Sequence, residues 1–324
     1  MPSGLTALRI RMVAAIVALG VVTVAFLAGV WAVFYGVLQL LDVGIAARLA
    51  FGTTVATVVT IGYLEYRQLE TIEYLADAHP VDRETAPDLY ETATRVAAQL
   101  GVPAPTIAVS DRDAPEALAV GLRPDAVHLV LSLGTIDALD GDQLEAVIAH
   151  ELAHVGNRDA MVMTAASLPV VLADGLGSRL DRIENPGWAA VVTVPLGFLS
   201  TAVWVVGRTI TARFSRARER AADRAAAEAT GSPAALASAL RRLDREIDET
   251  PDRDLREASS VSSLSVLSLE PDEPEKIMLG PEGETEPSYW QLRKRLYRLE
   301  RYLFDTHPAT DDRIAALAAL ERRQ

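Results

Sequence analysis

The sequence predicts a mainly α-helical α+β protein in which about four membrane-spanning helices interrupt one folded domain. Half of the 324 residues are hydrophobic although 23% are charged, so the apolar residues must be concentrated in blocks. Residues 12–41 and 185–207 each form such a block, without a single charged side chain. Both blocks reach the roughly 20 apolar residues that a helix needs to cross a bilayer. Between and after the blocks, three short β-type runs follow one another and amphipathic helical patterns lie on either side of them, which is typical of an α+β domain.

The predicted spans form two hairpins. Residues 49–64 are a second uncharged run, which follows the first block after a short turn. The other hairpin consists of residues 160–180, interrupted by Pro169 and Asp174, and of residues 185–207. Trp188 and Trp204 lie near the ends of the last block, as interfacial aromatic side chains do. A buried helical hairpin within a soluble domain is the alternative for this second pair.

The arrangement of the hairpins gives the expected organisation. We expect an N-terminal transmembrane hairpin over residues 1–68 and a second over 160–207, with the two parts of one catalytic domain at 69–159 and 208–324. Five arginines follow the last span within thirteen residues, and Arg9 and Arg11 precede the first. The positive-inside tendency then places both termini and the catalytic domain in the cytoplasm, so we expect a multi-pass protein of the cell membrane.

Helices and strands outside the spans follow from periodicity and from their end signals. Residues 88–100 predict an amphipathic helix that ends at Gly101, and short strands are expected at 106–110, 117–121 and 127–131. A helix begins near Asp140, which can form a capping box with Gln143. Further helices are expected over residues 209–230, 233–247, 290–303 and 311–323. Residues 248–288 are rich in Ser, Glu, Pro and Asp and predict a long loop.

Composition excludes several classes of function. The net charge of −13 argues against a nucleic-acid partner, which requires a basic surface. The absence of cysteine excludes disulfides, thiol nucleophiles and every cysteine-containing zinc site. A bound metal would therefore need histidine and carboxylate ligands, and the chain contains only five histidines.

The sequence His150-Glu151-Leu152-Ala153-His154 carries the predicted chemistry. A spacing of four places His150 and His154 on one face of a helix, one turn apart, where a single Zn²⁺ can bind both imidazoles. Glu151 lies about 100° around the helix, away from the metal but within reach of a water molecule that the metal activates. We therefore predict Glu151 as the general base. Two unrelated histidines on a surface helix are the alternative.

A catalytic zinc site needs a third protein ligand. The residues at 157 and 160 are Asn157 and Ala160, which excludes the pattern in which a third histidine follows on the same chain segment. Glu219 and Asp223 lie four residues apart on the helix that follows the last predicted span, and they are candidates for a ligand and for an acceptor of an imidazole N–H. Ordinary ion pairs with Arg216 or Arg220 are the alternative for these two carboxylates.

Three segments resemble the HtpX family of membrane zinc metalloproteases, which is related to the CAAX prenyl endopeptidases. They are the helix from Leu139 to Asp159 with its paired histidines, the string Ser215-Arg216-x-Arg218-Glu219-x-x-Ala222-Asp223, and Thr306-His307-Pro308 followed by Arg313-Ile314. The resemblance implies a gluzincin-type domain with one Zn²⁺, held by His150, His154 and Glu219. It also implies polypeptide substrates, either membrane proteins or misfolded proteins, in quality control at the membrane.

Two further features belong to the predicted site. Where such proteases usually have an Asn-Ala-Phe-Ala strand beside the cleft, this chain reads Glu116-Ala117-Leu118-Ala119. His307 is a possible stabiliser of the oxyanion, or it belongs to a turn before a helix that Thr310 caps and whose first turn carries Asp311 and Asp312. His79, expected at a helix end beside Pro80, and His128, expected in a strand, are predicted to lie outside the site.

Two other functions compete with a protease. A non-proteolytic hydrolase such as a deformylase-like amidase can use the same motif, but such enzymes usually use a cysteine ligand, and the chain has none. A catalytically impaired pseudoprotease that acts as a scaffold in the membrane would be expected to lack Glu151 or Glu219, and both residues are present.

Overall fold

The computed structural model describes residues 4–69, 78–120, 127–157, 159–249 and 289–323. The chain forms two compact units, each assembled from two segments. Unit 1 comprises Met1–Ala76 and Met161–Phe214, and unit 2 comprises Asp77–Ala160 and Ser215–Gln324. Most of the loop expected over residues 248–288 lies outside the described residues.

Unit 1 consists of long apolar helices. They are α1 (Gly4–Leu40), α2 (Ala46–Leu69), α6 (Asp159–Asp181), a 3₁₀ turn at Gly187–Ala189 and the first part of α7 (Ala190–Thr230). Its core joins side chains of all four α-helices, among them Phe26, Ile61, Leu172 and Leu196. At Gly207 a Cβ atom would lie 2.9 Å from the Val170 side chain, so glycine allows α6 and α7 to approach closely.

Three helices of the described chain are long and apolar enough to cross a membrane: residues Ile10–Leu40, Ala46–Leu64 and Gly187–Thr230. Large apolar side chains such as Val24 and Phe198, 67% and 80% exposed, point away from the core of unit 1. Lipid is the surrounding that such side chains favour. The predicted span over residues 160–180 forms α6, which is not one of these three helices, and Pro169 lies inside it.

Unit 2 contains a four-stranded sheet in the order β1-β2-β4-β3. The strands are β1 (Ala78–Pro80), β2 (Thr106–Ser110), β3 (Ala117–Val120) and β4 (His128–Ser132); β2 and β4 are parallel, and the other two pairs are antiparallel. Alternate residues face opposite sides, so Ile107 and Leu129 enter the main core while Ala108 and Val130 form a smaller cluster with Leu118. Strand β3 lies at one edge of this sheet.

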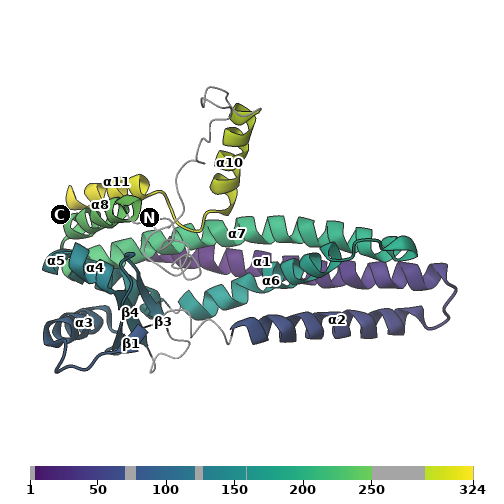
Figure 1. The fold of residues 1–324 in the computed structure, drawn as a ribbon, viewed down its shortest axis with the longest axis horizontal. Coiled ribbons are helices and arrows are strands. Elements are labelled where there is room, and N and C mark those ends of the chain that lie inside the picture. The colour runs from purple at the N-terminus through teal and green to yellow at the C-terminus, as the bar shows by residue number, and fades with distance from the viewer. Residues whose placement is uncertain (1–3, 70–77, 121–126, 158, 250–288, 324) are drawn as a thin grey trace, which may run out of the picture. The chain divides into compact units, whose positions relative to one another are not determined.

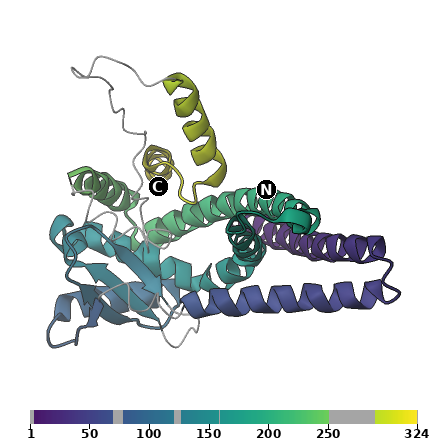
Figure 2. The same ribbon diagram turned by 45° about the vertical axis from the view of Figure 1, so that its right-hand side comes forward.

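Helices pack around this sheet together with the last part of α7. They are α3 (Pro87–Leu100), α4 (Leu133–Ala138), α5 (Gly141–Gly156), α8 (Pro233–Glu249) and α11 (Thr310–Glu321). Helix α10 (Trp290–Phe304) also belongs to unit 2, but it stands apart from α8 and α11 in both ribbon views (Figures 1 and 2). The main core lies between the sheet and α3, α5, α8 and α11, and it includes Val96, Val147, Leu240 and Leu317.

The structure confirms the three predicted strands and most of the helices, and it corrects four details. The helix expected at residues 209–230 is continuous with the last apolar block, as α7. Neither β1 nor α4 was predicted, because both are very short. His79 lies in β1 rather than at a helix end, and α11 begins at Thr310 with Ala309 before it and no side-chain cap. Thr310 instead donates a hydrogen bond to Asp244.

Candidate metal centre

Helix α5 positions three of the predicted site residues. Its N-terminus has the predicted capping box, in which Gln143 N donates to Asp140 Oδ1 at 2.9 Å and the Gln143 side chain accepts from Asp140 N at 3.2 Å. This cap supplies partners for two backbone N–H groups that the helix cannot satisfy itself. His150 and Glu151 are buried at 0% and 2% exposure. The site therefore lies on a face of α5 that is packed inside unit 2.

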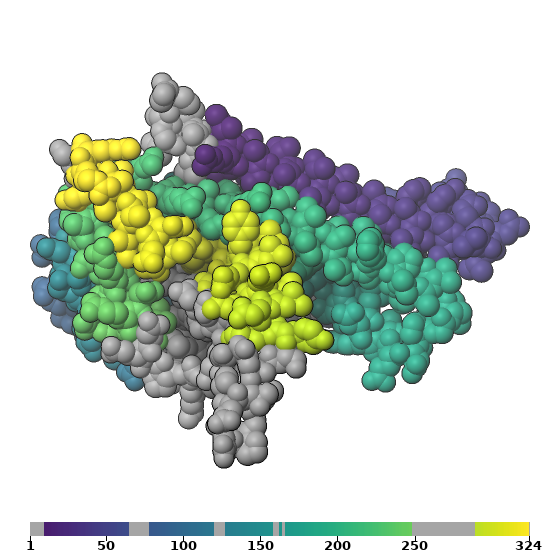
Figure 3. All heavy atoms as spheres, turned by 90° about the horizontal axis from the view of Figure 1, so that it is seen from above, coloured from purple at the N-terminus to yellow at the C-terminus, as the bar shows by residue number. Residues whose placement is uncertain are grey.

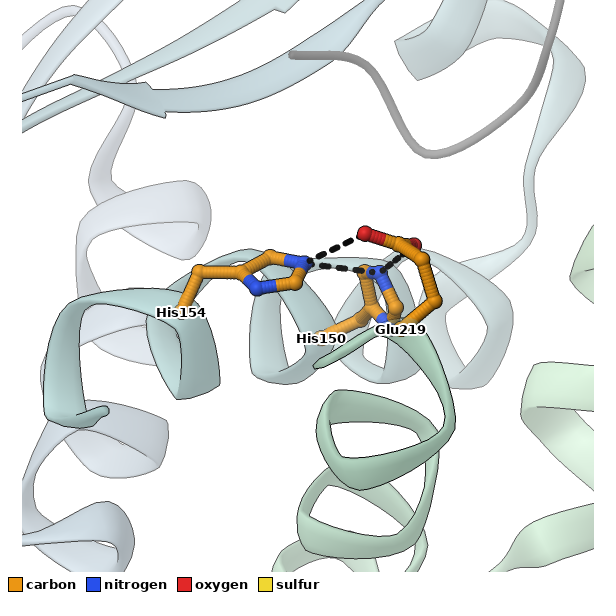
Figure 4. Close-up of side chains that lie close together, drawn as sticks. All are labelled: His150, His154 and Glu219. Atoms are coloured by element: carbon orange, nitrogen blue, oxygen red, sulfur yellow. Dashed lines mark hydrogen bonds and ion pairs between the residues drawn. The ribbon is translucent and has the colours of Figure 1, made fainter. Parts of the chain in front are cut away.

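His150, His154 and Glu219 converge on one point although Glu219 comes from α7 (Figure 4). The two Nε2 atoms are 3.2 Å apart. Glu219 Oε2 is 3.4 Å from His150 Nε2, and Glu219 Oε1 is 3.5 Å from His154 Nε2. Ligand atoms in a tetrahedral site with bonds of about 2.0 Å lie roughly 3.3 Å from one another. The separations in this cluster therefore fit a zinc ion.

The carboxylate of Glu219 offers a further test of that fit. Its Oε2 atom is buried and accepts no hydrogen bond within the described part of the chain. A buried carboxylate oxygen normally has a partner, because its desolvation is costly. A cation bound between the two imidazoles would supply that partner. The donor set, two imidazole nitrogens and one carboxylate, is also one that Zn²⁺ uses in catalytic sites.

A second set of contacts involves Nδ1, the other ring nitrogen of His150. His150 Nδ1 lies 3.0 Å from Asp223 Oδ1, and Arg313 of α11 donates to both oxygens of Asp223, at 3.0 and 2.6 Å. The partner of Asp223 is thus Arg313, not the Arg216 or Arg220 of the alternative considered above. Burial lowers the pKa of His150, but the carboxylates of Asp223 and Glu219 beside its ring outweigh burial and raise that pKa to about 9. A ligand histidine must be neutral, so metal binding would displace its proton.

Glu151 points toward the edge strand of the sheet. Its Oε2 atom accepts a hydrogen bond of 3.0 Å from the backbone N–H of Ala119 in β3. Burial is the largest influence on this carboxyl group, and it raises the pKa of Glu151 to about 8. Glu116, which precedes β3, is also buried and bonds Arg112 at 3.0 and 3.1 Å.

Two side chains at the site were not assigned a role from the sequence. Arg218 Nη2 lies 3.5 Å from both His154 Nδ1 and Glu219 Oε1, and Arg313 is 1% exposed in the core. One feature of the sequence could have indicated that Arg313 is buried. It lies next to Ile314 and four residues before Leu317, both of which belong to the apolar face of α11. His307 Nδ1 lies 3.8 Å from Glu219 Oε2, so His307 is near the cluster, while His79 and His128 lie in β1 and β4.

Comparison with known proteins assigns the chain to a family. The model of peptidase family M48 matches residues 83–321, most of the chain. The chain belongs to peptidase family M48. The matched residues contain both histidines of the cluster, Glu219, Asp223 and the C-terminal Arg313.

Individual relatives in the M48 family cover different shares of the chain. The Protease HtpX homolog 2 of Methanosarcina acetivorans is 36% identical over 59% of this chain, and the Protease HtpX homolog 1 of Streptomyces coelicolor is 35% identical over 57%. The chain spans 66% and 62% of the length of these two relatives. The Protease HtpX homolog of Moorella thermoacetica is 29% identical over 84% of each chain.

A solved structure shares the fold. The crystal structure of S. mikatae Ste24p matches 81% of this chain and 58% of its own chain, with a TM-score of 0.50 and 16% sequence identity. At 16% identity the similarity shows that this chain and Ste24p share a fold, and it supports no comparison of their sites.

Proposed function

We propose that this M48 protein is a membrane-bound, zinc-dependent endopeptidase that hydrolyses peptide bonds of membrane or misfolded proteins. The observation that carries the proposal is the convergence of His150, His154 and Glu219, with Glu151 on the next position of the same helix. Three protein ligands leave one coordination position for reactants, which is the arrangement of catalytic rather than structural zinc sites.

Each side chain of the centre has a role in this proposal. His150, His154 and Glu219 would hold the metal, and Asp223 would fix the ring of His150 through Nδ1. The metal, when bound, supplies Lewis acidity that favours attack of water on a carbonyl. Glu151 would accept the proton of that water and pass it to the leaving amine. His307, close to Glu219, is the candidate for stabilising the oxyanion.

The edge strand β3 supports a polypeptide as the substrate. The Glu116 carbonyl accepts a hydrogen bond from Ser132 N, so the backbone groups of residue 116 point toward β4. Along an antiparallel strand the backbone N–H and C=O groups of successive residues point alternately toward and away from the partner strand. The N–H of Ala119 accordingly points away from β4, and it donates to Glu151. An extended peptide that paired with the side of β3 that carries this N–H would therefore run next to the proposed base.

The membrane location follows from the three helices that are able to span a bilayer. The distribution of arginines supports a catalytic unit on the cytoplasmic side. Substrates would then be polypeptides that become accessible at the cytoplasmic face of the membrane.

Purified full-length protein in detergent provides the test. Metal content and casein cleavage are measured for the wild type and for Glu151→Gln, with and without a chelator. We expect about one zinc per chain in both proteins, cleavage by the wild type that the chelator abolishes, and a loss of about 10²–10⁴-fold in the variant. A wild type that binds zinc but cleaves no polypeptide would favour a scaffold, and a variant as active as the wild type would contradict the role of Glu151.

A further inference from the structure

Helix α10 (Trp290–Phe304) differs from every other helix of unit 2, because none of its residues is buried in the part of the chain that the structure describes. Its leucines are Leu292, Leu296, Leu299 and Leu303, and their spacing of four, three and four places them on one face of the helix. The first three are 53%, 55% and 52% exposed. In the space-filling view α10, coloured yellow-green, forms part of the outer surface (Figure 3). A soluble protein rarely leaves such a leucine stripe in water.

The charge of α10 is opposite to that of the rest of the protein. Five basic side chains and one acidic side chain, Glu300, give the helix a net charge of +4, whereas the whole chain carries −13. At 100° per residue, Arg293 and Arg295 flank the leucine stripe, and Lys294 and Arg301 lie on the opposite side. Trp290 begins the helix, and Tyr289 and Tyr302 are 80% and 69% exposed.

These properties point to one kind of partner. An exposed leucine face with basic residues beside it, and with aromatic residues near both ends, is the pattern of a helix that lies in the interface of an anionic bilayer. Pairing of two copies through the leucines would bring two helices of charge +4 together, which is unfavourable. The charge therefore favours a membrane over a second copy of the chain. Unit 2 is also covalently joined to helices that are able to span a bilayer, so a membrane would be near α10.

We propose that α10 binds the surface of the membrane, with its leucine stripe in the boundary between headgroups and acyl chains and with Arg293 and Arg295, which flank the stripe, on anionic lipid headgroups. This proposal rests on the membrane location in the proposed function, but not on proteolysis. Because α10 ends at Phe304, three residues before His307, lipid binding would fix one end of the segment that leads into the metal centre. Asp305, the next residue, accepts hydrogen bonds from Arg301 of α10 and, at its backbone carbonyl, from Arg216 of α7.

The absence of cysteine allows a direct test in the full-length chain. A spin label is attached at Leu299→Cys, or at Gln291→Cys on the polar side of α10 as a matched control. The protein is placed in bilayers of phosphatidylcholine or of phosphatidylcholine with phosphatidylglycerol, and flotation of the vesicles reports insertion of the chain separately. Label mobility and its access to oxygen and to a water-soluble relaxant then show whether the label lies in lipid.

We expect the label at Leu299→Cys to gain access to oxygen and lose access to the relaxant only in the anionic bilayer, while the label at Gln291→Cys stays in water. Arg293→Gln with Arg295→Gln should lower the ratio of bound to free helix about 25-fold, since each basic residue near such a surface contributes roughly fivefold. The exposed pair Arg322→Gln with Arg323→Gln, an equal change of charge at the end of α11, should have no effect.

Three results would overturn the proposal. The label at Leu299→Cys could remain equally accessible to the relaxant in both bilayers. It could be protected to the same extent with and without anionic lipid, which would assign the leucine stripe to a protein surface. Spin–spin broadening between copies would assign it to a second copy of the chain. A failure of insertion would instead appear in flotation and would contradict the membrane location itself.

Discussion

The buried ion pair of Asp223 and Arg313 allows fold stability and metal binding to be separated. Arg313 is 1% exposed and donates two hydrogen bonds to Asp223, which is 5% exposed. Removing Arg313 leaves the buried Asp223 carboxylate with only the His150 ring beside it, and the loss of one partner of a buried pair costs about 3–5 kcal/mol. We therefore expect Arg313→Met to lower the melting temperature by about 6–20 °C, at the 2–4 °C per kcal/mol of a domain of this size.

The double variant Asp223→Leu with Arg313→Met should behave differently. It removes both charges, and a buried pair replaced by apolar side chains is often neutral in stability. Most of the lost melting temperature should therefore return. The acceptor of the His150 Nδ1 proton is absent, however, so the affinity for zinc should fall about 10–100-fold, a loss typical when the support of a metal ligand is removed. Arg313→Met alone retains that acceptor and should bind zinc more tightly than the double variant.

Both quantities can be measured on detergent-purified protein. Thermal unfolding is followed in the presence of a chelator, so that bound metal does not contribute to the melting temperature. Zinc affinity is measured well below that temperature by competition with a chromophoric chelator. A double variant that melts as low as Arg313→Met would show that the two side chains do not stabilise each other. A double variant with the zinc affinity of the wild type would refute the role of Asp223 in orienting His150.

Three further predictions concern single positions. Glu219→Ala should lower both zinc occupancy and casein cleavage, because it removes one of the three proposed ligands; full zinc content by metal analysis would show that another residue is the third ligand. Ser132→Ala should destabilise the protein by about 1–3 kcal/mol in thermal unfolding, since the buried Ser132 hydroxyl accepts hydrogen bonds from two backbone N–H groups. Gly134→Ala should impair folding, because a Cβ atom would lie 1.9 Å from the Asp113 carbonyl oxygen. Gly141→Ala, where no atom is within 4 Å, is its control and should melt like the wild type.

Local patterns were enough to predict much of unit 2. The helix with the paired histidines was predicted correctly at its start because Asp140 and Gln143 are neighbours in sequence, and a capping box depends on a single turn of chain. The three predicted strands were found for a similar reason, since a short apolar run bounded by turn residues is a property of each strand alone. The very short β1 and α4 lack any such repeated pattern, and only pairing with other elements stabilises them.

The contacts around the metal centre needed the tertiary structure. Spacing on one helix predicted that His150 and His154 share a face, and the family resemblance pointed to Glu219, but neither showed that Arg313 bonds Asp223. Those two residues are 90 positions apart, and a contact of that kind depends on how α7 and α11 pack in the core of unit 2. The hydrogen bond from Ala119 to Glu151 likewise depends on the position of an edge strand against α5.

The sequence by itself therefore determined what each segment is, because hydropathy, helix caps and ligand spacing act within one or two turns of chain. It determined the apolar helices, the helix that presents two histidines, and the basic leucine face of α10. Only the tertiary structure decided which distant groups neutralise the buried charges of the centre. A carboxylate or guanidinium group can be buried only with a partner, and whether a partner is within reach depends on the packing of segments that are far apart in the chain.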